Sequence, residues 1–139
     1  MSGVCSMSKC VCSVFVICFL LHGGCELSTN VYKEGKGIYV QWCSSCHGID
    51  QQGLGSLYPP LTDLSAFSTS IGEIPCLIRL GSGAINGGDS LMQMPALTHL
   101  TDVEISNVLN YLNSLHWKLP EVQLNQIRHW LTQCEGTQK

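Results

Sequence analysis

The run Cys43-Ser44-Ser45-Cys46-His47 constrains this chain more than any other feature. It reads C-x-x-C-H, the attachment signature of a c-type haem. Two thiols at this spacing can add to the two vinyl groups of one porphyrin, and the adjacent histidine can bind the iron. The motif predicts a chain wrapped around one covalent haem c. Cys43 and Cys46 are then the attachment sites, and His47 is an axial ligand of the iron.

Two other chemistries use a C-x-x-C pair, and at this point they stay open as alternatives. A structural zinc site needs four ligands, usually from a second such pair, but Cys10 and Cys12 are too close and lie in an apolar stretch. A thioredoxin-like redox pair expects strands alternating with helices around it. No such alternation is visible, so haem is the favoured interpretation.

The N-terminus is typical of an export signal rather than of a folded element. Lys9 supplies one positive charge, and residues 10–21 form an uncharged apolar run, CVCSVFVICFLL. This layout, closed by small residues, is that of a secretory signal. The run is too short to span a bilayer, which takes about 20 residues. We therefore predict that residues 1–25 are a signal peptide and that the protein is exported.

The signal ends in Gly23-Gly24-Cys25, which resembles a bacterial lipoprotein box. His22 stands where that box usually has Leu, so the match is imperfect. Lipidation of Cys25 would anchor the protein to a membrane without spanning it. The predicted location is therefore periplasmic or membrane-anchored, with residues 26–30 as a linker.

From Cys25 onward about 115 residues remain, enough for one compact domain. Without Lys9, the 7 basic and 10 acidic side chains become 6 and 10, a net charge of −4. No basic stripe is present, so we expect no nucleic-acid partner. We expect a monomer.

The nine cysteines separate by position, with four inside the signal. Cys25 is the lipidation candidate, and Cys43 and Cys46 take the haem. The two that are left, Cys76 and Cys134, are predicted to form a disulfide, because spare thiols pair in an oxidising compartment. The alternative is two unrelated buried thiols.

The pattern of apolar residues predicts an all-α chain of four to five short helices, with no strand alternation. The first helix is expected over Val31–Trp42, and the haem-binding run closes it. Gly35 lies on its apolar face, where it would let another helix approach closely. Residues 48–60 are rich in glycine and proline and predict a loop.

Capping signals place the remaining helices. Ser70 with Glu73 predicts a capping box before a short helix, Ile74–Leu80, which has Pro75 in its first turn. Gly81 is expected to end that helix, and Gly81–Ser90 reads as a glycine-rich loop.

Thr101 with Glu104 is the strongest helix start in the chain, and that helix should run to about Leu115. Pro120 suits the first position of a last helix, Glu121–Thr132.

The sixth iron ligand is predicted to be Met94, because a thioether suits low-spin iron and Pro95 would stiffen its loop. Met92 is a rival two residues away. Weaker candidates are His22, His99, His116 and His129.

These motifs together resemble the class I cytochrome c family. The series Gly35-x-x-x-Tyr39-x-x-x-Cys43-x-x-Cys46-His47-Gly48 is similar to its N-terminal helix and haem site, and Val108-x-x-Tyr111-Leu112 is similar to its C-terminal helix. Met94-Pro95 resembles the axial loop. The resemblance implies that Pro59, 12 residues after His47, accepts a hydrogen bond from the imidazole through its carbonyl.

The resemblance covers roughly Val31–Trp117 and implies the class I cytochrome c fold, with its two terminal helices crossing at the glycine against an aromatic pair. The cytochrome domain is expected over residues 31–118. Residues 119–139 form a helical extension for which the family implies no role. Our hypothesis is that the extension braces the haem edge through the Cys76–Cys134 disulfide.

The implied function is outer-sphere electron transfer by a mono-haem carrier rather than an enzyme. Its partners would be redox proteins of a respiratory chain, such as an oxidase, a reductase or a dehydrogenase. One alternative is a dedicated acceptor for a periplasmic quinoprotein dehydrogenase, and another is a haem sensor or enzyme if the methionine ligand is labile. Arg79 could pair with a propionate. The apolar shell around the haem is expected from Tyr39, Leu61, Phe67, Leu97, Leu109 and Leu112.

Overall fold

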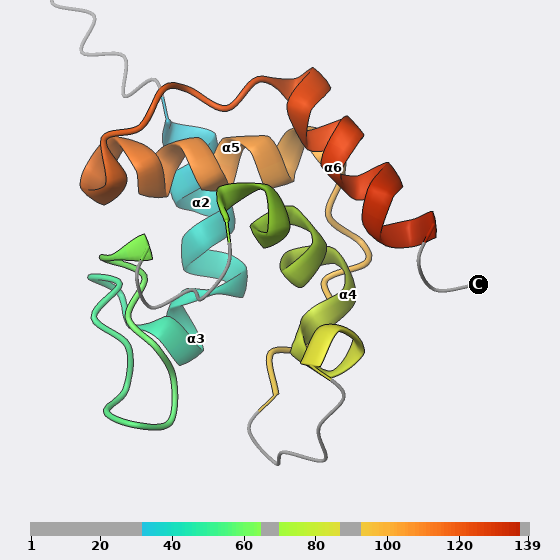
Figure 1. Ribbon diagram of the computed structural model, residues 1–139. Helices are drawn as coiled ribbons and strands as arrows, with labels where there is room; N and C mark the ends of the chain where they lie inside the picture. Colours follow the sequence, from blue (N-terminus) through green and yellow to red (C-terminus); the bar gives the residue numbers. More distant parts are fainter. Residues whose placement is uncertain (1–31, 65–69, 87–92, 137–139) are drawn as a thin grey trace, which may run out of the picture.

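The computed structural model describes residues 32–64, 70–86 and 93–136, and the described chain is helical (Figure 1). Its elements are α2 (Lys33–Trp42), α3 (Ser44–His47), η2 (Ile71–Glu73), α4 (Ile74–Asn86), α5 (Asp102–Leu112), η3 (Asn113–Trp117) and α6 (Leu124–Gly136). One isolated bridge joins Leu54 to Tyr58 within these ranges. The all-α prediction is confirmed.

Several predictions fall outside the described residues. They concern the signal peptide with Cys25, the linker, His22, Phe67 and Met92. Among the described helices, none has both the length and the apolar character needed to cross a membrane.

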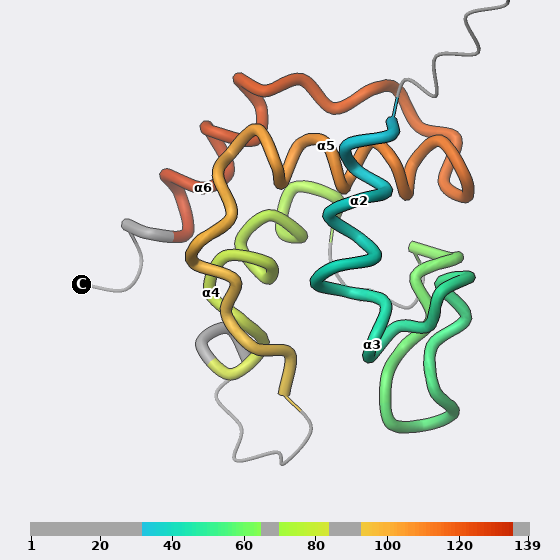
Figure 2. The backbone as a smooth tube through the Cα atoms, turned by 180° about the vertical axis from the view of Figure 1, so that it is seen from behind, coloured from blue at the N-terminus to red at the C-terminus, as the bar shows by residue number. Residues whose placement is uncertain are grey.

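Helices α2 and α5 cross at Gly35, as the sequence predicts (Figure 2). A Cβ atom at Gly35 would lie 2.1 Å from the carbonyl oxygen of Asn107, so this position admits no side chain. One turn along, the rings of Tyr39 and Tyr111 pack with their centroids 5.8 Å apart. The close approach and the aromatic pair together fix how α2 lies on α5.

The start of α4 differs from the sequence prediction. Ser70 precedes the 3₁₀ turn η2 and makes no side-chain capping bond; instead, the Glu73 N–H donates to the Ser70 carbonyl. The capping box at Ser70 and Glu73 was therefore wrong, because a backbone bond of the 3₁₀ turn takes the donor that the hydroxyl would have capped. Pro75 does lie in the first turn of α4, where it is fully buried.

Gly81 breaks α4 but does not end it. Its φ of 76° and ψ of 165° are not helical, and helical residues resume after it as far as Asn86. The prediction that residues from Gly81 onward form a loop was therefore wrong for residues 82–86. A glycine with positive φ can kink a helix and let it continue, because it has no Cβ to clash.

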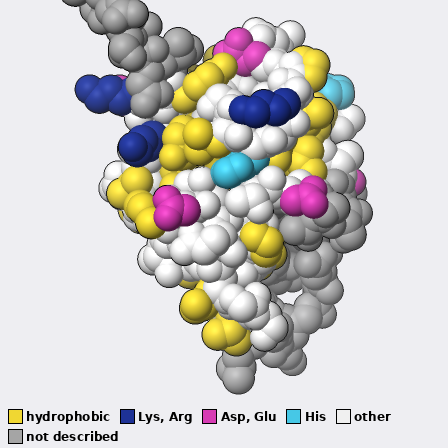
Figure 3. Space-filling view, turned by 90° about the vertical axis from the view of Figure 1, so that its left-hand side faces the viewer, with side chains coloured by type: hydrophobic (Ala, Val, Ile, Leu, Met, Phe, Trp, Pro, Cys, Tyr) yellow, Lys and Arg dark blue, Asp and Glu magenta, His cyan; other side chains and the backbone are white. Residues whose placement is uncertain are grey.

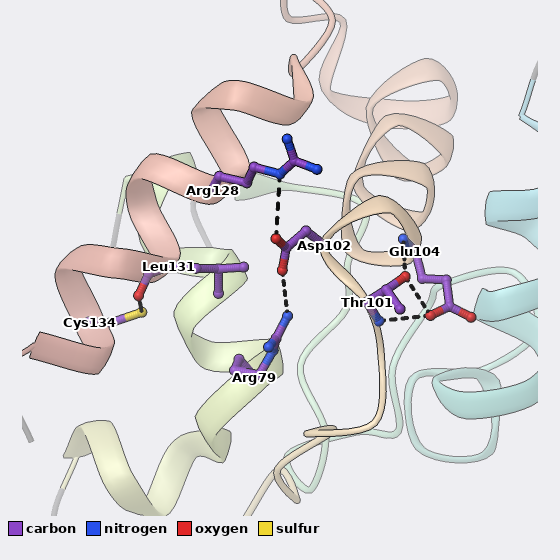
Figure 4. Close-up of polar contacts among 7 residues, drawn as sticks. All are labelled: Arg79, Thr101, Asp102, Glu104, Arg128, Leu131 and Cys134. Atoms are coloured by element: carbon purple, nitrogen blue, oxygen red, sulfur yellow. Dashed lines mark hydrogen bonds and ion pairs between the residues drawn. The ribbon is translucent and has the colours of Figure 1, made fainter.

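The capping box at the start of α5 is confirmed. The Glu104 N–H donates to the Thr101 hydroxyl at 3.3 Å, and the Glu104 carboxylate accepts from the Thr101 N–H at 2.7 Å (Figure 4). The bond from the Thr101 N–H, together with one from the Thr101 hydroxyl to the same carboxylate at 2.8 Å, holds the pKa of Glu104 below its usual value. At its other end α5 passes into a π-turn, η3, and Lys118 ends the helical run in a left-handed conformation with φ 56°.

The connection from α5 to α6 is held by two buried asparagines. Asn110 Oδ1 accepts from the Val122 N–H at 2.8 Å, and its Nδ2 donates to the Val122 carbonyl at 2.9 Å. Asn113 makes the same pair of bonds with the Leu119 backbone. Because these amides already bind that backbone, Pro120 does not begin a helix, and α6 starts at Leu124 rather than at Glu121.

Helix α6 lies beside α4 and the start of α5 (Figures 1 and 2). Val122, Ile127 and Leu131 join the same hydrophobic core as α2 and α5, so the extension packs on the domain. Cys76 of α4 and Cys134 of α6 form a disulfide across 58 positions of sequence. Asp102 adds ion pairs to Arg79 at 2.8 Å and to Arg128 at 3.7 Å (Figure 4).

Candidate haem-binding site

A cavity of about 610 Å³ opens between α3, the loop after it, α4, α5 and the segment from residue 93 to residue 97. This volume falls in the range of small-molecule and cofactor sites. Cys43, Cys46, His47, Pro59 and Met94, which the sequence singles out, all line it. Most of the other lining side chains are apolar: Trp42, Leu57, Tyr58, Leu61, Ile74, Leu77, Ile78, Pro95, Leu97, Leu100, Val108, Leu109, Leu112 and Trp117.

The two cysteines of the motif are unpaired thiols at the junction of α2 and α3. Burial raises the pKa of the Cys43 thiol to about 11, and the neighbouring Cys46 adds to the rise. Reactive dithiol pairs have lowered thiol pKa values instead. The environment of Cys43 is therefore that of a neutral thiol, which disfavours the dithiol redox alternative.

The imidazole of His47 is oriented by a backbone carbonyl. Its Nδ1 lies 2.9 Å from the Pro59 carbonyl oxygen, which leaves Nε2 as the nitrogen available to a metal. The Gly53 N–H donates to the His47 carbonyl at 2.8 Å and closes the same loop. Gly53 has a φ of 72°, and a Cβ there would meet the Tyr58 carbonyl oxygen at 2.5 Å.

Tyr39 of α2 supports this loop but does not line the cavity, contrary to the predicted apolar shell. Its hydroxyl donates to the Gly48 carbonyl at 2.6 Å, just after the haem-binding run. Burial, first of all, raises the pKa of Tyr39 well above its usual value, so the group stays a neutral donor. Leu61, Leu97, Leu109 and Leu112 of the predicted shell do line the cavity.

Two side chains of η3 hold the loop through hydrogen bonds that the sequence did not predict. The His116 ring nitrogen Nε2 lies 2.9 Å from Oε1 of Gln51, a buried side chain. The Trp117 indole N–H donates to the Leu61 carbonyl at 3.0 Å. His116 is thus half-buried, and no local pattern in the sequence could have paired residues this far apart.

Among the candidates for the second axial ligand within the described chain, Met94 alone lines the cavity. His99 packs against the Trp42 ring instead, with centroids 4.2 Å apart. His116 binds Gln51, and His129 lies on the exposed side of α6 against Gln133.

Residues 93–97, which we call the Met94 segment, are attached to α4. The Met94 N–H donates to the Ser82 hydroxyl at 2.9 Å, and the Ser82 N–H donates to the Met94 carbonyl at 3.0 Å. The Leu97 N–H donates to the Ile78 carbonyl at 2.9 Å. The sequence predicted the methionine but not this support, because Ser82 lay in what read as a loop.

Arg79 lies elsewhere than the sequence suggested. It pairs with Asp102 and is not among the residues that line the cavity. The suggestion that it meets a propionate is therefore not supported by its position, since the nearby carboxylate of Asp102 already takes its guanidinium.

The donor set fits a c-type haem. One imidazole, one thioether and two unpaired thiols reach the same largely apolar cavity, and the imidazole is held by a carbonyl, as metal-bound histidines usually are. Within the described residues, no cluster of three or more His, Cys, Asp or Glu side chains is placed to hold a metal ion directly.

Comparison with known proteins agrees with this geometry. The family model described as cytochrome c oxidase, cbb3-type, subunit III matches residues 30–112. Cytochrome c-554(548) of Halomonas halodenitrificans (strain ATCC 12084 / NCIMB 8669) is 34% identical over 72 residues, which span 52% of this chain and 82% of that protein. The chain belongs to the class I c-type cytochrome family. Such a cytochrome binds haem c, transfers electrons and works with redox protein partners.

The family match ends at Leu112, so η3, the connection after it and α6 lie outside the matched part of this cytochrome. These segments supply His116, Trp117 and Cys134. Part of the support for the site therefore comes from residues beyond the matched range.

Proposed function

We propose that this cytochrome is an exported mono-haem carrier of single electrons. Its one haem c would be joined to Cys43 and Cys46 and ligated by His47 and Met94. The observation that supports this proposal is that these four side chains line one cavity while the other ligand candidates in the described chain do not. The sequence contains one C-x-x-C-H run, which is the basis for a single haem.

The bound haem c would supply a one-electron couple, and the protein would supply its attachment, ligation and surroundings. Thioether bonds prevent loss of the cofactor, and two firm side-chain ligands keep reorganisation small. The apolar lining excludes water and disfavours extra positive charge, which raises the reduction potential, as the methionine ligand also does. Firm ligation by Met94 would leave no open iron position, which argues against an enzyme.

The edge of the cavity reaches the surface where a partner could approach. Trp42 and Leu57 line the cavity, and they are 41% and 51% exposed. On the face that includes the loop of residues 48–64, apolar side chains are scattered among charged ones of both signs (Figure 3). Such a surface suits the small, transient contacts of electron-transfer partners.

The partners we propose are redox proteins of a respiratory chain, an oxidase or a reductase. A periplasmic quinoprotein dehydrogenase, with this protein as its dedicated acceptor, is the second choice.

The protein would act either in the periplasm or anchored to a membrane. The anchor would be a lipid on Cys25. Mass spectrometry of the mature N-terminus would distinguish the two, since an acylated Cys25 adds the mass of its lipid.

The ligand assignment is tested by the ferric absorption spectrum, in which a weak far-red band reports a methionine sulfur on haem iron. We expect this band in the wild type and its complete loss in Met94→Ala. Met92→Ala is the matched control, because it removes the rival thioether and should keep the band. Loss of the band in Met92→Ala, or its survival in Met94→Ala, would transfer the ligand role to another residue.

Carbon monoxide separates a carrier from a sensor or an enzyme. The ferrous wild type should not bind the gas while methionine fills the sixth position, whereas ferrous Met94→Ala should bind it. Rapid binding by the wild type would instead favour the alternative in which the sixth position opens.

A further inference from the structure

The Met94 segment takes its position from a break in α4. In a regular α-helix, the Ser82 N–H would donate to the Ile78 carbonyl, four residues back. Here that pair is separated. The Ser82 N–H donates to the Met94 carbonyl at 3.0 Å, and the Ile78 carbonyl accepts from the Leu97 N–H at 2.9 Å. Both halves of one helical hydrogen bond thus serve the segment that carries the methionine.

Gly81 makes this exchange possible. Its φ of +76° turns the backbone out of the helix just before Ser82. The segment then packs so closely that a Cβ at Gly81 would lie 2.7 Å from the Met94 carbonyl oxygen and 2.8 Å from the Ala96 nitrogen. The kink therefore creates both the free donor at Ser82 and the space that Met94 to Ala96 occupies.

The Ser82 side chain adds a third bond. Its hydroxyl accepts from the Met94 N–H at 2.9 Å, so Met94 is held through both its N–H and its carbonyl. The next residue, Pro95, has no N–H and a fixed φ, which stiffens the backbone immediately after this two-bond attachment.

We propose that Ser82 is a positioning residue for the second axial ligand, and that its hydroxyl raises the free energy needed to swing Met94 away from the iron. This inference rests on the proposed ligation by Met94. When an external ligand binds ferric iron, the methionine must first leave, so the apparent affinity of that ligand reports how often the methionine is off. A weaker attachment of the segment should make external ligands bind more tightly.

The test is a titration of the haem-loaded ferric protein with imidazole, followed by its absorption spectrum. Ser82→Ala removes one hydrogen bond from the Met94-on state, and we expect about fivefold tighter imidazole binding. Ser82→Thr keeps the hydroxyl and should bind imidazole as the wild type does. The matched control is Ser114→Ala, which removes a half-buried hydroxyl bonded to the Tyr111 carbonyl, away from this segment.

The inference is overturned if Ser82→Ala binds imidazole with wild-type affinity, or if Ser82→Ala and Ser114→Ala change the affinity equally. The second result would mean general destabilisation. These failures differ from failure of the proposed ligation. In that case the wild type itself would lack the far-red band before any change at Ser82.

Discussion

The two sides of the cavity are held by different means. On the His47 side, residues 43–61, the proposed ligand lies on α3, which begins after Cys43 and contains Cys46, the two proposed attachment cysteines. Side chains of α2 and η3 bind the loop backbone there: Tyr39 at Gly48, and Trp117 at Leu61. On the Met94 side, residues 74–86 and 93–97, the proposed ligand lies on a segment bonded to a kinked helix, largely through backbone groups.

The difference teaches where this fold can yield. On the His47 side, the proposed ligand and the two proposed attachment cysteines lie within five residues of one another. The Met94 side depends on α4, and α4 is in turn joined to α6 by the Cys76–Cys134 disulfide and packed beside it. A disturbance of the C-terminal extension should therefore reach Met94 before it reaches His47. The variants below test this order.

The largest effect is expected from the double variant Cys76→Ser/Cys134→Ser. A crosslink between residues 58 positions apart restricts the unfolded chain, and its removal should cost about 4 kcal/mol of unfolding free energy, measured by urea denaturation of the haem-loaded protein. The amides of Ser82 and Leu97 should also exchange hydrogen faster, since both donate between α4 and the Met94 segment.

The comparison sites for that variant are the amides of Gly53 and Leu61, which donate within the His47 side. Their exchange should change only as much as global stability does. Equal local acceleration at all four amides would contradict the independence of the two sides.

An intermediate effect is expected at the helix crossing, which supports both sides. Gly35→Ala would place a methyl group 2.1 Å from the Asn107 carbonyl oxygen and force α2 away from α5. Overpacking of this kind costs about 1–3 kcal/mol. Thermal and urea unfolding measure this loss of stability. The intensity of the far-red band and the hydrogen-exchange rate of the Gly53 amide should both change, because α2 leads into the haem motif.

Gly37→Ala is the matched control on the same helix, because a Cβ there meets nothing within 4 Å. It should stabilise the protein slightly, by about 0.5–1 kcal/mol, since alanine loses less backbone entropy than glycine in a helix. If Gly35→Ala were as well tolerated as Gly37→Ala, the crossing would not be the shared support that we describe.

Local signals in the sequence were sufficient for the parts of the fold that local chemistry determines. The Thr101 box and the helix before Cys43 follow from short-range patterns and were predicted, whereas the close crossing at Gly35 was implied by the resemblance to class I cytochromes c. The residues of the site could be named for the same reason, because the haem motif and the Met94-Pro95 pair are contiguous in the chain.

What the sequence could not provide was the partner of each long-range polar group. The later start of α6 depends on Asn110 binding the Val122 backbone, which no local pattern reveals. The continuation of α4 beyond Gly81 depends on Met94 and Leu97 taking up the hydrogen-bonding groups that the kink releases. These features are decided by tertiary contacts, which override the local preference of glycine for ending a helix.

The smallest effect is expected on the His47 side, from Trp117→Phe. This change keeps an aromatic ring against the cavity but removes the N–H that donates to the Leu61 carbonyl. One such hydrogen bond contributes about 1 kcal/mol to the free energy of unfolding. The Leu61 and Gly53 amides should exchange faster, while those of Ser82 and Leu97 follow global stability alone.

Trp130→Phe makes the same chemical change on α6, where the indole packs against Gly72 next to the disulfide. If the two sides are independent, this control should leave the Leu61 and Gly53 amides unchanged beyond any global effect. A Trp117→Phe variant that instead lost the far-red band, with the Leu61 amide still protected, would show that η3 acts on Met94. Such a result would reverse the order of yielding, because the C-terminal region would then govern the methionine through η3 rather than through α4.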